Sequence, residues 1–190
     1  MKDLLCEIKN CSLCKEYLPL HPFPVVRASE TAKIVIIGQA PGIRVHNSGI
    51  PWNDPSGVEL RRWLNIESDI FYDQSKIAII PMGFCYPGTG KNGDLPPRKE
   101  CAPQWHQKLF DLMPNVKLVL LIGQYSQKYY LNKPKKNLTE TVKSFEEYLP
   151  QYFCLPHPSP RNRLWMKKNF WFEENVIPTL REKIETILKK

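Results

Sequence analysis

The sequence lacks the features that would place the chain in a membrane or in a secretory route. No apolar run approaches the roughly 20 residues that a membrane-spanning helix requires. The first residues, Met1 to Cys6, contain no long apolar stretch of the kind found in signal peptides. No internal repeat and no second domain are visible. We therefore expect a cytoplasmic protein built as a single domain over residues 1–190.

The composition is that of a globular protein with an excess of positive charge. Hydrophobic residues make up 42% of the 190 positions, which is enough to bury a sizeable core. Acidic residues are fewer than basic ones, and the net charge is +8 with a pI of about 9.2. Such a balance favours a polyanionic partner, although a solvated basic surface gives the same numbers. The motifs must decide between the two.

Continuous runs of valine, isoleucine and leucine predict strands that are covered on both faces. The runs are residues 33–38, 76–82, 117–123 and 152–156. Apolar residues at helical spacing also predict helices in four places. These are residues 56–64, 103–113, 125–131 and 175–190. Because strands alternate with helices, the expected fold is α/β, a three-layer α/β/α sandwich around a central four-stranded parallel sheet.

The loops that follow the strands are the candidate site regions, because sites in such folds gather beyond the carboxyl ends of the strands. The first of these loops begins Gly38-Gln39-Ala40-Pro41-Gly42, where glycine permits a sharp turn and proline stiffens it. It carries neither the GxxxxGK nor the GxGxxG pattern of phosphate-binding loops. The polar, turn-rich stretch that follows, residues 47–57, contains one large aromatic residue, Trp52.

A second candidate loop follows the last predicted strand and begins His157-Pro158-Ser159-Pro160-Arg161-Asn162. A histidine at a strand end, inside a loop stiffened by proline, is more often functional than structural. Residues 163–169 then interleave basic and aromatic side chains. This composition is expected where a protein grips phosphates and bases, and a solvated amphipathic turn is the alternative.

The six cysteines fall mainly into two pairs. In a reducing cytoplasm, clustered cysteines indicate a metal, a cluster or a reactive thiol rather than disulfides. Cys11 and Cys14 form a CxxC motif before the first strand, and Cys85 and Cys101 bracket fifteen residues of the loop after the second strand. Two pairs in separate segments can supply four converging sulfurs. Cys154 lies in an apolar strand, where we expect core packing.

Taken together, these motifs resemble the uracil-DNA glycosylase superfamily. Its members carry a first motif written GQDPY, GEAPG or GLAP, then an aromatic residue in a G-x-P-F setting, and later a His-Pro-Ser motif. The chain has Gly38-Gln39-Ala40-Pro41-Gly42, Gly49-Ile50-Pro51-Trp52 and His157-Pro158-Ser159 in the same order. The cysteine pattern is similar to that of the bacterial iron–sulfur members with the GEAPG motif.

The resemblance implies a DNA-repair glycosylase that hydrolyses the N-glycosidic bond of a flipped-out deaminated base, uracil or a related one. The expected enzyme is monofunctional, because no matching motif places a lysine as a Schiff-base nucleophile. Its partner would be DNA that contains a damaged base, and we expect a monomer. The alternative is a non-catalytic nucleic-acid-binding module of the same fold that carries an iron–sulfur cluster or zinc.

The resemblance also implies roles for residues of the two loops. His157 would donate a hydrogen bond to O2 of the base, where negative charge develops as the bond breaks. Trp52 would stack on the flipped base, with core packing as the alternative. Gln39 and His46 are weaker candidates for contacts with the base or with water. Arg161 stands where other members carry a leucine that fills the space left by the flipped nucleotide. The remaining expected substrate-binding residues are Gly38, Ala40, Pro41, Gly42, Met82, Ser159 and Asn162.

By the same resemblance, a [4Fe–4S] cluster would be bound by Cys11, Cys14, Cys85 and Cys101. Its role would be structural, since it would order the loop over residues 86–100. Zinc is the alternative, because four thiolates suit it as well. Cys6 lies close enough in the sequence to replace one ligand.

Two positions depart from the pattern of the uracil-specific members. Ala40 stands where the GQDPY members carry a catalytic aspartate. Asp54 is similar in its setting to an aspartate proposed as the acid of GLAP members, and its alternative role is to cap the following helix. Pro81 stands where uracil-specific relatives carry an asparagine that reads the base, and proline has no side-chain amide. Either backbone groups of residues 82–84 read the base, or the substrate is another deaminated base such as hypoxanthine.

Overall fold

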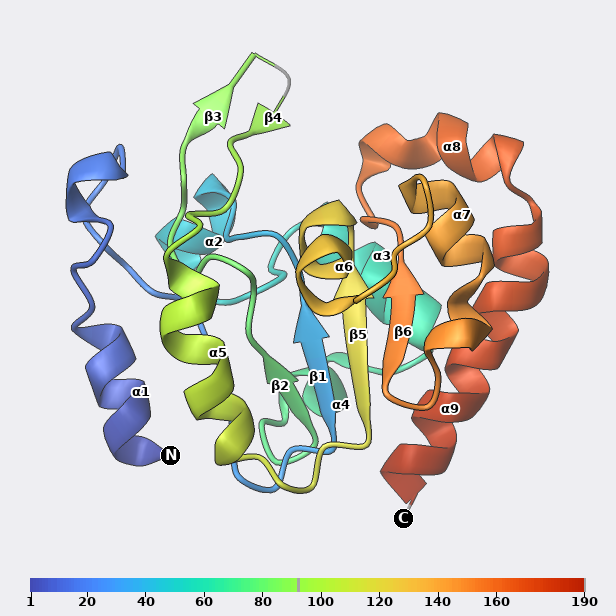
Figure 1. The fold of residues 1–190 in the computed structure, drawn as a ribbon, viewed down its shortest axis with the longest axis horizontal. Coiled ribbons are helices and arrows are strands. Elements are labelled where there is room, and N and C mark those ends of the chain that lie inside the picture. The colour runs from blue at the N-terminus through green and yellow to red at the C-terminus, as the bar shows by residue number, and fades with distance from the viewer. Residues whose placement is uncertain (92, 190) are drawn as a thin grey trace.

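A computed structural model describes residues 1–91 and 93–189 of the chain (Figure 1). Its centre is a four-stranded parallel sheet with the order β2-β1-β5-β6. The strands are β1 (Ile34–Ile37), β2 (Ile77–Ile79), β5 (Leu118–Ile122) and β6 (Tyr152–Leu155). All four lie within the predicted runs. The predicted range 1–190 also includes Asn92 and Lys190, which lie outside the described residues.

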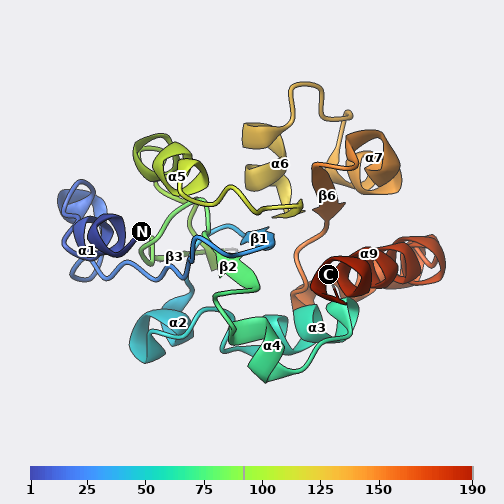
Figure 2. The ribbon, with the colours of Figure 1, turned by 90° about the horizontal axis from the view of Figure 1, so that it is seen from below.

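Helices cover both faces of the sheet, which confirms the predicted three-layer α/β/α arrangement (Figure 2). One face carries α3 (Pro55–Leu64), α4 (Ser68–Tyr72) and α9 (Ile177–Lys189). The other face carries α1 (Lys2–Lys9), α5 (Cys101–Asp111) and α6 (Gln124–Tyr130). Three further short helices are α2 (Ile43–Ser48), α7 (Leu138–Lys143) and α8 (Arg163–Lys168). Among the described residues, no helix has the length and apolar character needed to cross a membrane.

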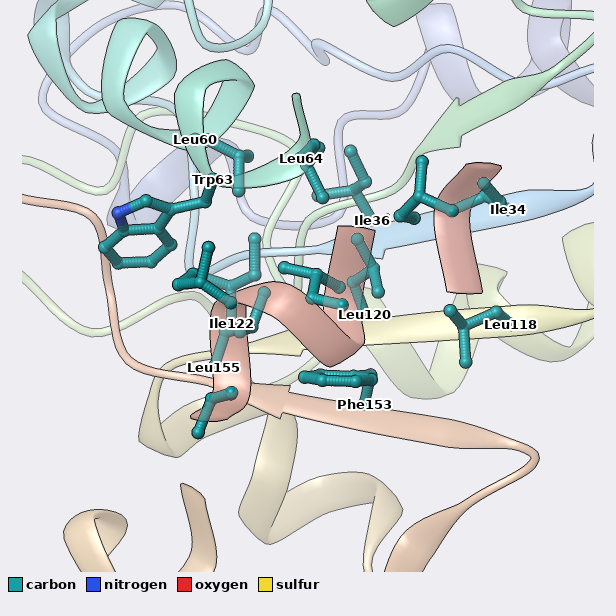
Figure 3. Close-up of a cluster of buried hydrophobic side chains, with 14 of the residues drawn as sticks. Ile34, Ile36, Leu60, Trp63, Leu64, Leu118, Leu120, Ile122, Phe153 and Leu155 are labelled. Atoms are coloured by element: carbon teal, nitrogen blue, oxygen red, sulfur yellow. The ribbon is translucent and has the colours of Figure 1, made fainter. Parts of the chain in front are cut away.

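The core is divided by the sheet, because alternate residues of a strand point to opposite faces. Ile34 and Ile36 of β1 join the cluster under α3 and α9, whereas Val35 and Ile37 join the cluster under α1 and α5. Figure 3 shows the first cluster, in which Trp63 and its neighbours on α3 face side chains of β1, β5 and β6. A fully buried isoleucine or leucine contributes about 1.5–3 kcal/mol, so these two layers dominate the stability of the fold.

The predicted helices match the observed ones closely, with one exception. Residues 56–64, 103–113 and 125–131 correspond to α3, α5 and α6 with ends shifted by one or two residues. The predicted helix 175–190 instead starts as a π-helical segment, Phe172–Val176, and continues as α9. The described residues also form three short 3-10 segments. They are Lys15–Tyr17, Phe145–Tyr148 and Pro160–Asn162.

An antiparallel hairpin that was not predicted lies in the loop between Cys85 and Cys101. It pairs β3 (Thr89–Gly90) with β4 (Gly93–Asp94). The sequence of residues 88–93 has the glycine spacing GxGxxG, but Gly90 and Gly93 pair in this hairpin and do not form the strand-to-helix junction of a dinucleotide site. The hairpin projects beyond the same edge of the sheet to which the strands point (Figure 1).

A buried polar chain ties α5 to the end of β2. The Nε2 of His106 lies 3.0 Å from the carbonyl oxygen of Pro81, and its Nδ1 lies 2.5 Å from the hydroxyl of Tyr130. Because a carbonyl oxygen can only accept, Nε2 carries the proton and Nδ1 accepts from the tyrosine. Burial lowers the pKa of His106 to about 4, so the ring is neutral at neutral pH. These hydrogen bonds thereby fix the backbone of Pro81.

We expect His106 to make the fold sensitive to acid. As pH falls, the unfolded chain, in which the histidine has its ordinary pKa, binds a proton before the folded chain does. The stabilisation is therefore present at neutral pH and is lost as pH falls toward about 4. Between pH 7 and pH 5 the free energy of unfolding should fall by about 2 kcal/mol more than in a His106→Gln variant. Urea unfolding at these pH values measures the difference.

The exposed His21 offers a matched control, because His21→Gln removes a ring that does not lie in the core. This variant should keep the pH dependence of the wild type. Equal dependence on pH in the wild type and in His106→Gln would contradict the assignment of His106.

Candidate active site

A solvent-open pocket of about 450 Å³ lies at the carboxyl edge of the sheet. This volume falls within the range of small-molecule sites. Five segments, together with Val25 and Val45, contribute to its walls. The segments are residues 38–42 after β1, residues 51–56 around the start of α3, Ile79 and Pro81 of the second strand region, Gly93 and Asp94 of the hairpin, and residues 157–161 after β6. The two loops singled out from the sequence therefore meet at one cavity.

Most of the predicted site residues line this pocket. They are Gly38, Gln39, Ala40, Pro41, Gly42, Trp52, Asp54, His157, Ser159 and Arg161. Three others lie elsewhere. Asn162 lines a neighbouring cavity, while Met82 and His46 are buried in the interior.

Trp52 is held in the pocket wall by two glycines. A Cβ on Gly38 would lie 2.8 Å from Cζ2 of Trp52, so the ring rests directly on the backbone of Gly38. A Cβ on Gly57 would lie 1.7 Å from the carbonyl oxygen of Trp52. Trp52 itself has a φ of 57°, which is uncommon for a residue with a side chain. Its ring both packs against the core and lines the pocket, so core packing leaves the ring available to the cavity.

The ring of His157 lies beside that of Trp52, with centroids 5.5 Å apart and planes inclined by 33°. Burial lowers the pKa of His157, and the charges of Asp54 and Asp94 oppose this by raising it. The net shift is downward, so the imidazole is neutral at neutral pH and presents an N–H donor without a positive charge.

Hydrogen bonds within the second loop hold His157 in place. The side chain of Asn162 donates to the carbonyl oxygen of His157 at 2.7 Å. The hydroxyl of Ser159 accepts from the backbone amide of Arg161 at 3.3 Å, which caps the short 3-10 segment that follows. Asn162, predicted to bind substrate, thus holds the backbone of the loop and lines the neighbouring cavity.

Asp54 is the N-cap of α3. Its Oδ1 accepts a hydrogen bond of 2.8 Å from the amide of Gly57, and Pro55 occupies the first helical position. This is the arrangement expected at a helix start. Asp54 also lines the pocket, and its charge acts on His157. Capping and a contribution to the site are therefore compatible in the same side chain.

Gln39 connects the first loop to the hairpin. Its side-chain amide donates to the carbonyl oxygen of Leu95 at 2.9 Å, and the amide of Leu95 donates to Gly88 at 2.8 Å. Gln39 lines the pocket, but its amide nitrogen is engaged by the protein.

The end of β2 presents no free backbone donor to a base. The amides of Met82, Gly83 and Phe84 donate to the carbonyl oxygens of Gly38 and Gln39 and to the sulfur of Cys101, at 2.9, 3.0 and 3.3 Å. Of the backbone groups of residues 82–84 that were expected to read the base, the amides are therefore already engaged within the protein.

Strand parity explains the position of Met82. Ile80 and Met82 point into the cluster under α5, whereas Ile79 and Pro81 point toward the pocket side. Pro81, which has no side-chain polar group, therefore lines the pocket at the position where Met82 was predicted.

His46 lies in an aromatic cluster outside the pocket wall. Its ring is only 7% exposed and contacts the rings of His21, Phe23 and Tyr86. Burial lowers the pKa of His46, and its Nδ1 has no hydrogen-bond partner in the described structure. The neighbouring Val45 faces the pocket instead. The predicted contact between His46 and the base is not supported.

Asp94 lines the pocket although it was not among the predicted site residues. It comes from β4 in the loop between the two later cysteines, and the hydroxyl of Thr89 donates to its Oδ1 at 3.3 Å. The sequence indicated that this loop follows a strand, but it gave no signal that a hairpin would turn one of its carboxylates toward the first loop.

A second, smaller cavity is lined by all four predicted cysteine ligands. They are Cys11, Cys14, Cys85 and Cys101. Burial raises the pKa of Cys85 to about 11 and that of Cys101 to about 12, so both are thiols unless a cation stabilises the thiolates. Within the described parts of the chain, no group of three or more histidine, cysteine, aspartate or glutamate side chains is arranged to hold a metal ion directly.

The two other cysteines lie away from this cavity. Cys6 is exposed and receives a long hydrogen bond from the side chain of Asn10. Cys154 is fully buried in the core, as predicted.

A Gly57→Ala substitution should disrupt the wall that holds Trp52. The new methyl group would overlap the carbonyl oxygen of Trp52, which is backbone and cannot move aside without breaking the cap of α3. We expect the free energy of unfolding to fall by about 3 kcal/mol. The adjacent Val58→Ala is the control, because Val58 is 62% exposed. Denaturant melts of both variants test this, and equal stability would contradict the close approach.

Comparison with known families places these features in context. The model of the uracil DNA glycosylase superfamily matches residues 26–181. This range contains both site loops, the hairpin and α8, and it begins after Cys11 and Cys14. A match over this much of the chain, with a site at the carboxyl edge of a four-stranded parallel sheet, shows that the chain belongs to the uracil DNA glycosylase superfamily, a family of hydrolases that act on DNA.

Proposed function

We propose that the chain is a monofunctional DNA glycosylase that hydrolyses the N-glycosidic bond of a flipped-out deaminated base, uracil or a related one. The observation that carries the proposal is the meeting of Trp52, His157 and Asp54 in one solvent-open pocket. An extruded base needs an aromatic surface to replace its stacking partners, and the bond needs stabilisation of the charges that form as it breaks. The three side chains supply these functions.

In this proposal, the base lies against Trp52 and accepts a hydrogen bond from the neutral ring of His157. As the bond between C1′ and the base nitrogen breaks, its electron pair moves to the base, and the donor stabilises the growing negative charge. The sugar becomes cation-like, and the carboxylate of Asp54 stabilises that charge electrostatically. A base that leaves as an anion requires no strong general acid.

The wall beside the base is mainly apolar, which bears on the choice of base. Val25, Ile79 and Pro81 line this side of the pocket, and the amides of residues 82–84 are engaged within the protein. An amide reader for N3 and O4 of uracil is therefore missing from this strand end. We infer that recognition depends mainly on stacking, so hypoxanthine and xanthine, which do not present the N3 and O4 pattern of uracil, are tested together with uracil.

Basic residues beside the pocket would bind the phosphates of the DNA backbone. Arg163, Lys167 and Lys168 lie on α8, which stands at the same edge of the sheet as the hairpin (Figure 1). Leu164 on the same helix is 72% exposed, and Phe170 just beyond it is 67% exposed. Cationic and apolar groups together suit contact with phosphates and unstacked bases. Binding should weaken as salt increases.

For the cofactor, we propose that Cys11, Cys14, Cys85 and Cys101 bind a [4Fe–4S] cluster, with zinc as the alternative. Four sulfurs from two distant segments line one cavity, and the amide of Phe84 points to the sulfur of Cys101, as donors do around cluster thiolates. The group would supply a structural cross-link between the amino-terminal segment and the hairpin loop. Such thiolates persist in a reducing cytoplasm, where we expect the protein to act as a monomer.

A base panel tests the proposed activity. Duplex and single-stranded oligonucleotides that contain uracil, hypoxanthine or xanthine are incubated with the protein, and alkali-labile sites are counted on a gel. We expect cleavage of at least one base by the wild type and a loss of about 100-fold or more in the His157→Ala variant. His21→Ala is the matched control, because His21 lies outside the pocket wall.

The result also separates the two classes of function. Salt-sensitive DNA binding without cleavage of any base would replace the enzyme by a non-catalytic binding module. Strand breaks without alkali would contradict the monofunctional assignment.

The cofactor is tested on protein prepared without oxygen. We expect a brown protein with a broad absorbance band near about 400 nm and with iron and acid-labile sulfide in equal amounts. Cys85→Ser should lower the iron content and the melting temperature, whereas the core variant Cys154→Ala should keep the iron. Zinc without iron would establish the alternative, and the absence of both metals would overturn the site.

A further inference from the structure

The hairpin brings a second carboxylate into the pocket, in addition to that of Asp54 at the start of α3. Asp94 ends β4 and lines the same cavity as Trp52, Asp54 and His157. Its Oδ2 lies 3.2 Å from the position that a Cβ on Gly42 would occupy, so the carboxylate lies against the first loop. Figure 1 shows the hairpin above the carboxyl ends of β1 and β2, with α8 across the same edge. Asp94 therefore reaches the pocket from a different element than Asp54.

The two carboxylates are held differently. Oδ1 of Asp54 accepts a 2.8 Å hydrogen bond from the amide of Gly57 and is thereby committed to the cap of α3. Oδ1 of Asp94 receives a longer bond of 3.3 Å from the hydroxyl of Thr89. Asp94 is also the more exposed of the two, so its carboxylate is accessible to water at the pocket. These differences suit Asp54 to a fixed electrostatic role and Asp94 to contact with water.

Both carboxylates act on the same histidine. The charges of Asp54 and Asp94 each raise the pKa of His157 against the effect of burial. Because such interactions weaken with distance, Asp94 lies near the donor that is proposed to contact the base.

We propose that Asp94 is a catalytic residue, the general base that takes the proton of the attacking water; this rests on the glycosylase function proposed above. The bond between C1′ and the base nitrogen breaks, and its electron pair leaves with the base. The oxygen of water forms a bond to C1′ and transfers one proton to Asp94. The proton then passes from Asp94 to the base anion, which leaves an abasic sugar, a neutral base and the original carboxylate.

The hairpin is positioned for this role by two contacts. The side chain of Gln39 holds the carbonyl of Leu95, the residue after Asp94, at 2.9 Å. On the other side, a Cβ on Gly93 would lie 2.4 Å from a guanidinium nitrogen of Arg161, so the arginine packs directly on the hairpin backbone. Both loops that define the pocket thereby touch the segment that carries Asp94.

Single-turnover cleavage of the best substrate from the base panel tests the proposal. Asp94→Asn should reduce the rate by about 100-fold or more, the effect expected for loss of a general base. Affinity for an undamaged duplex should stay within about twofold, because the variant removes a negative charge from the pocket and no phosphate contact. Asp94→Glu, which keeps the carboxylate, should recover part of the lost rate.

Two controls fix the interpretation. Asp69→Asn removes the same charge from α4, outside the pocket wall, and should leave the rate unchanged. Asp54→Asn should lower the free energy of unfolding by about 1 kcal/mol through the weakened cap. Its cleavage rate should fall less than that of Asp94→Asn. As a readout independent of cleavage, NMR titration should show a lower pKa of His157 in Asp94→Asn, because a nearby negative charge has been removed.

The outcomes are distinguishable. Cleavage by Asp94→Asn within about threefold of an active wild type would overturn the role of Asp94 and leave the glycosylase function intact. An unchanged pKa of His157 would show that Asp94 lies too far from the base, which also overturns it. A wild type that cleaves no base of the panel would remove the proposed function itself, and the role of Asp94 with it.

Discussion

The close contact between Trp52 and two glycines is the constraint on which the site depends. The ring can rest on Gly38 and the turn can pass over Gly57 only because neither glycine carries a Cβ. This contact joins the end of β1 to the start of α3 and sets the Trp52 ring beside His157. The positive φ of Trp52 is then tolerated because the surrounding structure holds it. A pocket wall, a helix cap and an aromatic surface thus follow from one local packing arrangement.

Much of the fold could be predicted because apolar runs report burial directly. Strands covered on both faces leave a continuous signal, and β1, β2, β5 and β6 all lie within predicted runs. Short polar elements leave a weaker signal, so the sequence predicts only loops where α2, α8 and the hairpin lie. The amphipathic helix α1 was also missed, although its buried residues Leu4 and Ile8 lie four positions apart.

The site was only partly predictable for a different reason. Motifs gave Trp52 and His157, because each lies in a loop with its own recognisable sequence, and both line the pocket. Met82 was misplaced because one residue of strand parity turns a side chain to the opposite face. Asp94 was missed because its position depends on a contact between segments that are far apart in sequence, which a linear pattern does not encode.

The anchoring of the hairpin that carries Asp94 affects the entropy of association with DNA. Its flanks are anchored before any ligand arrives, by the bond from Gln39 to Leu95 and by the packing of Arg161 on Gly93. Flanks that are already anchored lose little conformational entropy on association. In the proposed function, the encounter with a duplex therefore resembles docking of a preorganised surface more than coupled folding, and the extruded nucleotide accounts for the larger rearrangement.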